Sequence, residues 1–387
     1  MFETKYFDGL KERTYNEALL QIAGGAKAVG VYCAFTPQEL IAAAKALPVT
    51  LCAGSEEPVG AAEQHLPKNL CPLVKSSYGY ALTNTCPYFD LVDFLFADAT
   101  CDGKKKMFEL LNNIKPVHVL HLPQTYQTEE STLSWLKELY KMKSILEQET
   151  GNKITAAELN EQIKLFNEYR TAVKELFELN KGDNTVLFGK EICDILDVDG
   201  GIFYKLERRS KEIRESANAA RERYKDLSFQ SKVKNRSRIL LTGCPSTNPK
   251  VINLIEQGSG MVVAMENCGG LKTVGTLVEI NHDPMRALAE YYVKTACPCM
   301  TPNPRRFDII GRIIEEYNID GVVELTWHAC HTYNVEAHSV KKYIREKFNK
   351  PYFQIETDYS EGDTEQIRIR IDAFLEILRQ EGDRPKA

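Results

Sequence analysis

The thiols of this sequence are its side chains best suited to chemistry. Eleven cysteines occur among 387 residues, and their odd number disfavours a framework in which every thiol is paired in a disulfide. The first residues mix charges early and form no apolar signal region, so we expect a cytoplasmic protein. In that reducing compartment, metal binding, redox chemistry and plain burial are the uses that remain for a thiol.

Cys330 shows most clearly how a thiol could be positioned. It follows an apolar run that begins at Asp320 and reads as a strand, and residues 335–347 after it read as a helix. Open α/β sheets bind their ligands at such strand-to-helix turns, where a thiolate can hold a metal or act as a nucleophile. His328 and His331 flank Cys330 and titrate near neutral pH, so they are candidate catalytic proton donors, with ordinary structural roles as the alternative.

The cysteines recur in the same order in the two halves of the chain. Local sequence agrees around Cys71 and Cys297, each of which is followed by proline. The alternative is that any two α/β domains show strands at similar spacing, and matched cysteines at four positions make it less attractive. The corresponding positions of the first and second halves are Cys33 and Cys244, Cys52 and Cys268, Cys71 and Cys297, Cys101 and Cys330.

Apolar runs alternate with helix-like segments in both halves, which predicts parallel sheets covered by helices on both faces. We therefore expect two pseudo-symmetric, doubly wound lobes of Rossmann-like or flavodoxin-like α/β type. Residues 124–235 instead carry apolar residues at helical spacing and predict a helical insert that acts as a spacer and dimer surface. The expected division is an N-terminal α/β lobe at 1–123, the insert or linker at 124–235, and a C-terminal α/β lobe at 236–387. The expected strands are 28–32, 48–51, 91–97, 116–122, 239–243, 261–264, 321–326 and 352–356.

Composition and missing motifs exclude several other classes. The net charge of −5 argues against nucleic acid as the main partner, and no apolar run approaches the roughly 18 residues of a membrane helix. The sequence contains neither G-x-x-x-x-G-K-[ST] nor G-x-G-x-x-G, so no nucleotide fingerprint is expected in it.

Soft thiolates select iron–sulfur clusters or zinc. Structural zinc sites favour paired cysteines on a tight knuckle, and only the segment Cys297-Pro298-Cys299 comes close, with a spacing one residue short. Widely spaced cysteines from separate loops fit a cluster held between two lobes better. Zinc and buried structural thiols remain the alternatives at this point.

Several separated motifs resemble a known family. They are Asn69-Leu70-Cys71-Pro72-Leu73-Val74-Lys75-Ser76-Ser77-Tyr78-Gly79, Thr100-Cys101-Asp102-Gly103-Lys104-Lys105-Lys106, Cys330-His331-Thr332-Tyr333 and Ile355-Glu356-Thr357-Asp358-Tyr359. In this order, and over nearly the whole chain, the sequence resembles the 2-hydroxyacyl-CoA dehydratase / benzoyl-CoA reductase superfamily. Within it, the sequence is most similar to the branch of double-cubane cluster proteins.

The resemblance implies a set of metal ligands. In the superfamily, three cysteines hold a [4Fe-4S] cluster between two α/β lobes, and these correspond to Cys71, Cys101 and Cys330. The double-cubane branch carries an [8Fe-9S] cluster, which calls for six cysteines. We expect the second three to be Cys268, Cys297 and Cys299, with Cys52, Cys86 and Cys244 held in reserve, and we expect Cys193 to be an ordinary thiol.

The resemblance also implies a function. A separate ATP-hydrolysing activator with its own [4Fe-4S] cluster would donate low-potential electrons, and the chain, expected to be a homodimer, would reduce a small molecule of the acetylene or hydrazine kind. One alternative is a subunit of a 2-hydroxyacyl-CoA dehydratase with a single [4Fe-4S] cluster. Another is a non-catalytic protein for electron transfer or cluster storage.

Other polar residues near these motifs have candidate roles. Glu266 and Glu324 could relay protons, although most such glutamates are surface or capping groups. Gly103 and Gly269 would allow close approach of the backbone to a cofactor or offer N–H donors to sulfide. The run 104–106 of lysines is expected to form a solvated helix face or, second, to help an acidic partner dock.

Overall fold

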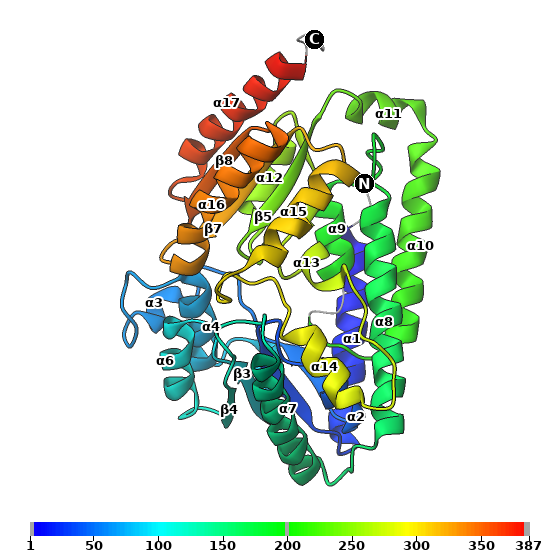
Figure 1. The fold of residues 1–387 in the computed structure, drawn as a ribbon, viewed down its shortest axis with the longest axis vertical. Helices are drawn as coiled ribbons and strands as arrows, with labels where there is room; N and C mark the ends of the chain where they lie inside the picture. Colours follow the sequence, from blue (N-terminus) through cyan, green and yellow to red (C-terminus); the bar gives the residue numbers. More distant parts are fainter. Residues whose placement is uncertain (1–3, 198–200, 383–387) are drawn as a thin grey trace.

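The computed structural model describes residues 4–197 and 201–382, and it contains two four-stranded parallel sheets (Figure 1). One sheet has the order β2-β1-β3-β4 and the other the order β6-β5-β7-β8. The strands are β1 (Ala28–Tyr32), β2 (Leu47–Thr50), β3 (Phe94–Asp98), β4 (Val117–Leu120), β5 (Ser237–Gly243), β6 (Gly260–Glu266), β7 (Gly321–Trp327) and β8 (Tyr352–Thr357). The predicted fold class is confirmed, and the matching strand orders confirm that the second half repeats the topology of the first.

The expected strand at 91–97 begins too early. Pro87 occupies the first turn of the short helix α5 (Pro87–Leu91), because its fixed φ suits a helix start, and β3 begins only at Phe94. The other helices of the first half are α1 (Thr4–Ala23), α2 (Gln38–Ala43), α3 (Val59–Ala62), α4 (Pro72–Thr83) and α6 (Asp102–Leu111). Helix α1 ends at Ala23, just before Gly25 adopts a φ of 96°.

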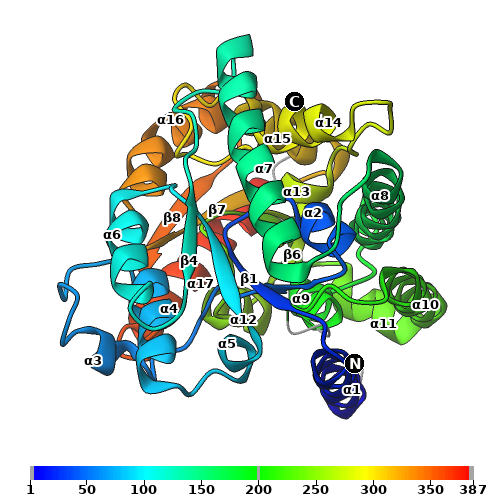
Figure 2. The same cartoon turned by 90° about the horizontal axis from the view of Figure 1, so that it is seen from below.

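The helices of residues 124–235 are divided between the two sheets. Trp135 and Leu139 of α7 are fully buried in one core with Phe96 of β3, whereas Leu176 of α8 shares a core with Val262 of β6. The helices are α7 (Glu129–Thr150), α8 (Ala156–Glu178), α9 (Gly189–Leu196), α10 (Leu206–Tyr224) and α11 (Leu227–Val233). Helices α8 and α10 lie side by side along both lobes (Figures 1 and 2). The division of the chain into three domains stays a prediction.

A buried polar contact joins the N-terminal lobe, the insert and the C-terminal half. Arg170 of α8 donates to Glu39 of α2 at 2.5 Å, and the hydroxyl of Tyr292 donates to the other oxygen of Glu39 at 2.7 Å. Tyr292 belongs to α14, which packs in the core of the N-terminal lobe. The helices of the second half are α12 (Lys250–Gln257), α13 (Leu271–Val274), α14 (Pro284–Tyr292), α15 (Pro304–Glu316), α16 (His331–Phe348) and α17 (Thr364–Gly382).

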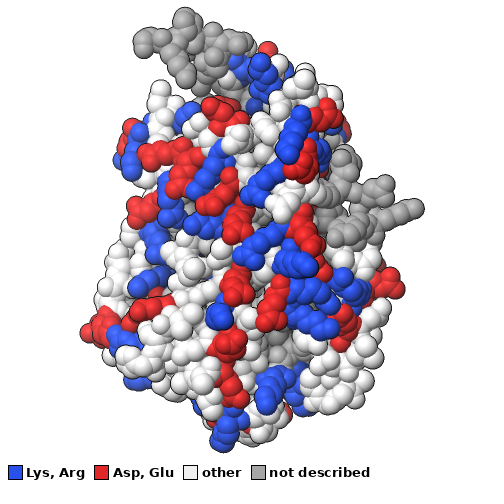
Figure 3. All heavy atoms as spheres, turned by 90° about the vertical axis from the view of Figure 1, so that its right-hand side faces the viewer, with Lys and Arg blue, Asp and Glu red and all other residues white. Residues whose placement is uncertain are grey.

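The side of the molecule that carries α8 and α10 presents interspersed acidic and basic side chains (Figure 3). Arg214 of α10 pairs with Glu175 of α8 at 2.8 Å, and Arg208 pairs with Glu17 of α1 at 2.8 Å. These exposed and half-exposed ion pairs connect neighbouring helices. Because the two signs alternate, this surface carries no large patch of a single charge (Figure 3). Among the described helices, none is long and apolar enough to cross a membrane.

Candidate functional site

The carboxyl ends of the two sheets face each other across the boundary between the lobes. The loop after β2 meets the loop after β5, since Asn248 donates from Nδ2 to the carbonyl of Gly54 at 3.1 Å. A Cβ on Gly54 would lie 2.3 Å from the carbonyl oxygen of Thr247, so only glycine allows this approach. The hydroxyl of Tyr359 adds a bond of 3.2 Å to the carbonyl of Ala53.

The same edge carries thiols from both lobes. Cys33 and Cys244 directly follow β1 and β5, while Cys101 and Cys330 are the N-cap residues of α6 and α16. Cys33 itself has a φ of 86°, in a region that non-glycine residues rarely adopt, and at the end of β5 the corresponding turn uses Gly243 with a φ of 104°. Strained backbone of this kind is held in place only where the surrounding structure fixes it, and it clusters at functional sites.

Three thiols form what we call the Cys330 group, which consists of Cys71, Cys244 and Cys330. Hydrogen bonding with the thiols of Cys244 and Cys71 holds the pKa of Cys330 well below its usual value. Conversely, the interaction with Cys330, together with burial, raises the pKa of Cys71, and burial followed by the same interaction raises that of Cys244. A thiolate shared by two neighbouring thiols at a helix N-terminus is the donor chemistry that a soft metal centre needs.

A second set, the Cys268 group, consists of Cys33, Cys52, Cys268, Cys297 and Cys299. Hydrogen bonding with Cys299 lowers the pKa of Cys297 to about 7 and raises that of Cys299. Burial raises the pKa of Cys268 to about 11, and the charges of Cys297 and Cys52 act in the same direction. Burial also raises the pKa of Cys33, with added repulsion from Cys268 and Cys297. These thiols come from both lobes and are electrostatic neighbours.

The sequence-predicted ligands divide unevenly between these groups. Cys71 and Cys330 lie together as expected, but in the described part of the chain Cys101 makes no hydrogen bond to either, and the thiol beside them is Cys244. Cys268, Cys297 and Cys299 also lie together as expected. Their neighbour Cys33 was in neither the predicted set nor the reserve, although its pairing with Cys244 in the internal repeat could have indicated it. The ligand set stays a prediction.

Cys86 and Cys193 stand outside both groups. Cys193 lies on α9 with its sulfur 3.8 Å from that of Met265, and burial raises its pKa to about 12. Cys86 is the N-cap residue of α5. Within residues 4–197 and 201–382, no three His, Cys, Asp or Glu side chains are arranged to hold a single metal ion.

Lys104 is a buried cation beside these thiols. It is 9% exposed, so the expected solvated face of residues 104–106 holds for Lys105 and Lys106 but not for Lys104. Burial alone lowers the pKa of Lys104, but the charges of neighbouring cysteines from both lobes outweigh it and raise the pKa well above its usual value; they are Cys33, Cys52, Cys101 and Cys268. Across the described residues, Lys104 has no hydrogen-bond or ion-pair partner. The buried carboxylate of Asp98 feels this charge without pairing with it, so the ammonium remains free to pair with an anionic group between the lobes.

Lys272 is the second buried cation, and it has an acidic partner within the fold. Its Nζ donates to the hydroxyl of Tyr333 at 2.7 Å and lies 3.1 Å from Glu266 Oε1. The charges of Cys268 and Cys297 also act on it. Lys272 therefore connects the Cys268 group to a network of buried carboxylates.

Arg306 holds that network together. Its guanidinium contacts Glu266 at 3.2 Å, Glu324 at 2.9 Å and Glu336 at 2.5 Å, and the side chains of Arg306, Glu266 and Glu324 are fully buried. Thr242 donates to Glu266 Oε2 at 2.5 Å. Glu266 thus contacts the site through Lys272, with its own carboxylate shielded from solvent, and its catalytic role stays a prediction.

The remaining predicted residues flank cysteines of both lobes in the sequence. His328 is half exposed, with Nδ1 3.6 Å from Asp358 Oδ2, and His331 is the exposed first residue of α16. A Cβ on Gly103 would lie 2.9 Å from the terminal methyl of Leu70, a side chain that can shift to accept it. At Gly269 a Cβ would meet only Asn267 Oδ1 at 3.8 Å, and the close backbone approach occurs instead at Gly270. The proposed roles of these four residues stay predictions.

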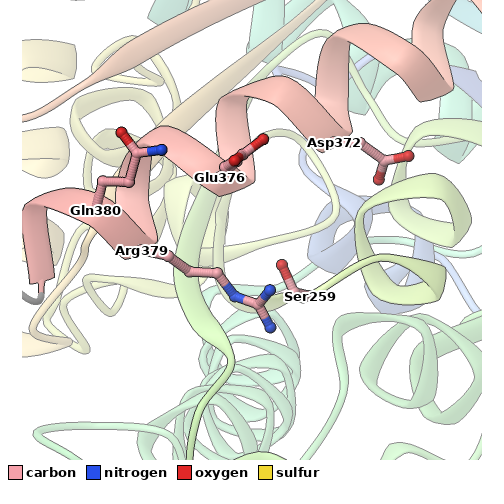
Figure 4. A pocket seen from close by; sticks show the side chains of 5 residues that line it. All are labelled: Ser259, Asp372, Glu376, Arg379 and Gln380. Carbon is pink, nitrogen blue, oxygen red and sulfur yellow. The ribbon is translucent and has the colours of Figure 1, made fainter.

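Two hollows differ in their relation to the thiols. One of 510 Å³ is lined by Ser259 before β6 and by polar side chains of α17 (Figure 4). Because Ser259 precedes the amino end of β6, this hollow lies at the opposite end of the sheet from the cysteines. The other, of 280 Å³, includes Cys52 and Cys86 in its lining and lies at the carboxyl ends of β1 and β2.

The residues present fit an anionic metal–sulfur group. Two sets of neighbouring thiols supply soft donors, and the partnerless ammonium of Lys104 supplies the compensating charge. The fold and this site define a two-lobed α/β protein with a thiol-rich centre at the boundary between the lobes.

The family follows from comparison with known proteins. Residues 33–378 match the family model described as 2-hydroxyglutaryl-CoA dehydratase, D-component, and the chain belongs to that family. It is 40% identical, over 92% of each chain, to the putative dehydratase subunit YjiM of Escherichia coli. It is 25% identical over 92% of each chain to the (R)-phenyllactyl-CoA dehydratase beta subunit of Clostridium sporogenes. A benzoyl-CoA reductase subunit of Thauera aromatica is 22% identical over 59% of this chain and 58% of its own. The resemblance of the sequence motifs to this superfamily is thereby confirmed, and the relatives are named as subunits of dehydratases and of a reductase.

Proposed function

We propose that this chain is the iron–sulfur component of an ATP-dependent reductase, with an [8Fe-9S] double cubane between its lobes and a small molecule as substrate. The observation that carries the proposal is the presence of two thiol groups rather than one. A single cubane needs three cysteines from the chain, and the Cys330 group alone provides them. The Cys268 group, with its own partnerless cation, supports a second metal–sulfur unit beside the first.

The ligands would come from both groups. The geometry favours Cys71, Cys244 and Cys330 for one cubane, with Cys101 as the third ligand that the resemblance implies in place of Cys244. Cys268, Cys297 and either Cys299 or Cys33 would hold the other. When bound, such a cluster stores electrons and offers iron or sulfide to a small ligand.

The chain's own residues would set the conditions at that centre. Lys104 brings positive charge to the thiolates, and the Arg306 network fixes the position of Lys272. The contact between Tyr359 and Ala53 closes the lobes over the thiols. Burial and nearby cations both tune the potential of an iron–sulfur centre.

Electrons would come from a separate ATP-hydrolysing activator that carries a [4Fe-4S] cluster. The resemblance implies this partner, and the chain itself has no P-loop sequence, which agrees with ATP hydrolysis on another protein. A homodimer and a cytoplasmic location belong to the same proposal.

A dehydratase subunit with one [4Fe-4S] cluster is the second candidate, and the names of the relatives favour it. In that case the reaction would be a lyase reaction on a 2-hydroxyacyl-CoA, and a second, different subunit would complete the site. The third candidate is a protein for electron transfer or cluster storage without a substrate of its own.

Iron and acid-labile sulfide per chain, measured after anaerobic purification and combined with EPR after reduction, separate these candidates. About eight irons per chain support the double cubane, and about four support the dehydratase. Zinc with little iron would overturn both. Turnover of hydrazine or acetylene with activator and ATP distinguishes a reductase from an electron carrier.

A further inference from the structure

The cavity of 280 Å³ lies beside the thiols and shares one lining residue, Cys52, with the Cys268 group. It opens between α1, α4 and α5, at the carboxyl ends of β1 and β2. Its wall is rich in hydroxyl groups and contains two thiols. The residues that matter here are Tyr32, Cys52, Ser77, Thr85, Cys86 and Tyr88.

Tyr32 is the unusual member of this wall. It is the last residue of β1 and is 1% exposed, yet within the described residues its hydroxyl makes no hydrogen bond. Because Tyr32 lines the cavity and finds no acceptor in the described part of the fold, a group inside the cavity can accept a hydrogen bond from its hydroxyl.

Charge and size define the ligand that would fit. The charged residues of the described lining are Lys11 and Asp197, and they form an ion pair with each other at an exposed rim. The interior therefore favours a neutral molecule. Since one water takes about 30 Å³ of liquid, the cavity of 280 Å³ admits roughly nine non-hydrogen atoms. A coenzyme A thioester is far too large to be enclosed.

We propose that this cavity binds a small neutral molecule whose nitrogen or oxygen lone pair accepts a hydrogen bond from Tyr32, next to Cys52 of the Cys268 group. As a binding site the cavity stands on its geometry alone. Its meaning as the substrate chamber rests on the proposed reductase function, because Cys52 connects the cavity to the thiols that would hold the second metal–sulfur unit.

Binding is tested in the anaerobically purified protein with Cys86 as reporter, because this thiol lines the cavity and lies outside both thiol groups. The probe is acetamide, a neutral acceptor of four non-hydrogen atoms. It should slow alkylation of Cys86 by iodoacetamide, as followed by peptide mass spectrometry, at roughly 0.1–1 M, where a fragment of millimolar affinity saturates its site. Tyr32→Phe should weaken this protection about fivefold, the effect of one lost hydrogen bond. Alkylation that acetamide does not slow overturns the proposal.

A matched pair of variants tests whether the cavity itself is responsible. Thr85→Trp fills the cavity and should abolish the protection, whereas Thr83→Trp changes an exposed neighbour outside the lining and should retain it. Equal loss in both variants overturns the proposal.

Turnover separates this inference from the proposed function. If the wild-type protein reduces hydrazine, Thr85→Trp should lower kcat/KM at least tenfold with unchanged iron content and EPR spectrum. If acetamide protects Cys86 in the wild-type protein but the protein reduces no hydrazine, the reductase function is rejected and the binding site stands. If Thr85→Trp reduces hydrazine as fast as the wild type, the cavity does not hold the substrate, whereas the reductase function stands.

Discussion

Lys104 of the N-terminal lobe and Lys272 of the C-terminal lobe are both buried beside the Cys268 group, but only one of them is paired. Lys272 contacts Glu266 and Tyr333, whereas Lys104 has no polar partner among the residues described. Lys104 stands three residues after Cys101, and Tyr333 stands three residues after Cys330, so the repeat places a cation and a phenol at equivalent points. One lobe therefore balances its charge internally, and the other leaves a charge for a ligand.

The first prediction concerns the internally balanced lobe. Arg306→Met removes the cation that three carboxylates share and leaves the fully buried Glu324 without a cationic partner, which should lower the free energy of unfolding by about 3–5 kcal/mol. Denaturant unfolding of metal-free protein measures it. Arg305→Met, at a neighbouring half-exposed position, is the control and should cost less than about 1 kcal/mol. A loss below about 1 kcal/mol for Arg306→Met would mean that the network does not stabilise the lobe.

The second prediction concerns the thiols that the two lobes contribute. Cys330→Ala and Cys244→Ala should each remove most of the iron held by the Cys330 group, because each thiol neighbours the third member, Cys71. Iron content and the EPR spectrum measure the effect, with Cys193→Ala as the unaffected control. Cys101→Ala tests which thiol is the third ligand, Cys244 as the geometry favours or Cys101 as the family resemblance implies. Loss of iron in that variant but not in Cys244→Ala would assign the third ligand to Cys101.

The strands of both sheets could be predicted from the sequence, but the contacts between distant segments could not. Period and turn residues placed every strand, and the error at residues 91–97 came from a proline that starts a helix after Cys86. An amphipathic pattern shows that α7 buries one face, but it cannot show which sheet the helix covers. In the sequence, Lys104 cannot be distinguished from the two lysines that follow it. Only the fold shows that Lys104 is buried close to thiols of the other lobe.

The third prediction uses Glu256, a buried carboxylate of the C-terminal lobe that belongs to neither thiol group. Burial raises the pKa of Glu256 from 4.5 to about 7, although three backbone N–H groups donate to it. The folded state then binds more protons than the unfolded state between these values, so this group's contribution to stability falls as pH rises from 4.5 to 7, by about 1–3 kcal/mol. Glu256→Gln should flatten that part of the profile in urea unfolding at several pH values. An unchanged slope would show that Glu256 is ionised throughout.

The fourth prediction returns to the two lysines and has the smallest expected effect. Lys104→Met removes a charge that forms no ion pair in the described fold and acts on the buried Asp98 only at a distance, so the metal-free protein should be nearly as stable as the wild type, in contrast to Arg306→Met. In loaded protein the same change removes a cation that favours the reduced, more negative centre. The midpoint potential should therefore fall by on the order of 50 mV, as expected for one charge at moderate dielectric.

EPR-monitored redox titration measures this potential, and Lys105→Met, an exposed neighbour paired with Asp102, is the matched control with no shift. Lys272→Met provides the opposite test. Because the buried Glu266 loses one of its two cationic partners, that variant should destabilise the metal-free protein in the way that Lys104→Met does not. If both lysine variants destabilise the metal-free protein equally, Lys104 is paired within the fold, and its charge is not reserved for a ligand between the lobes.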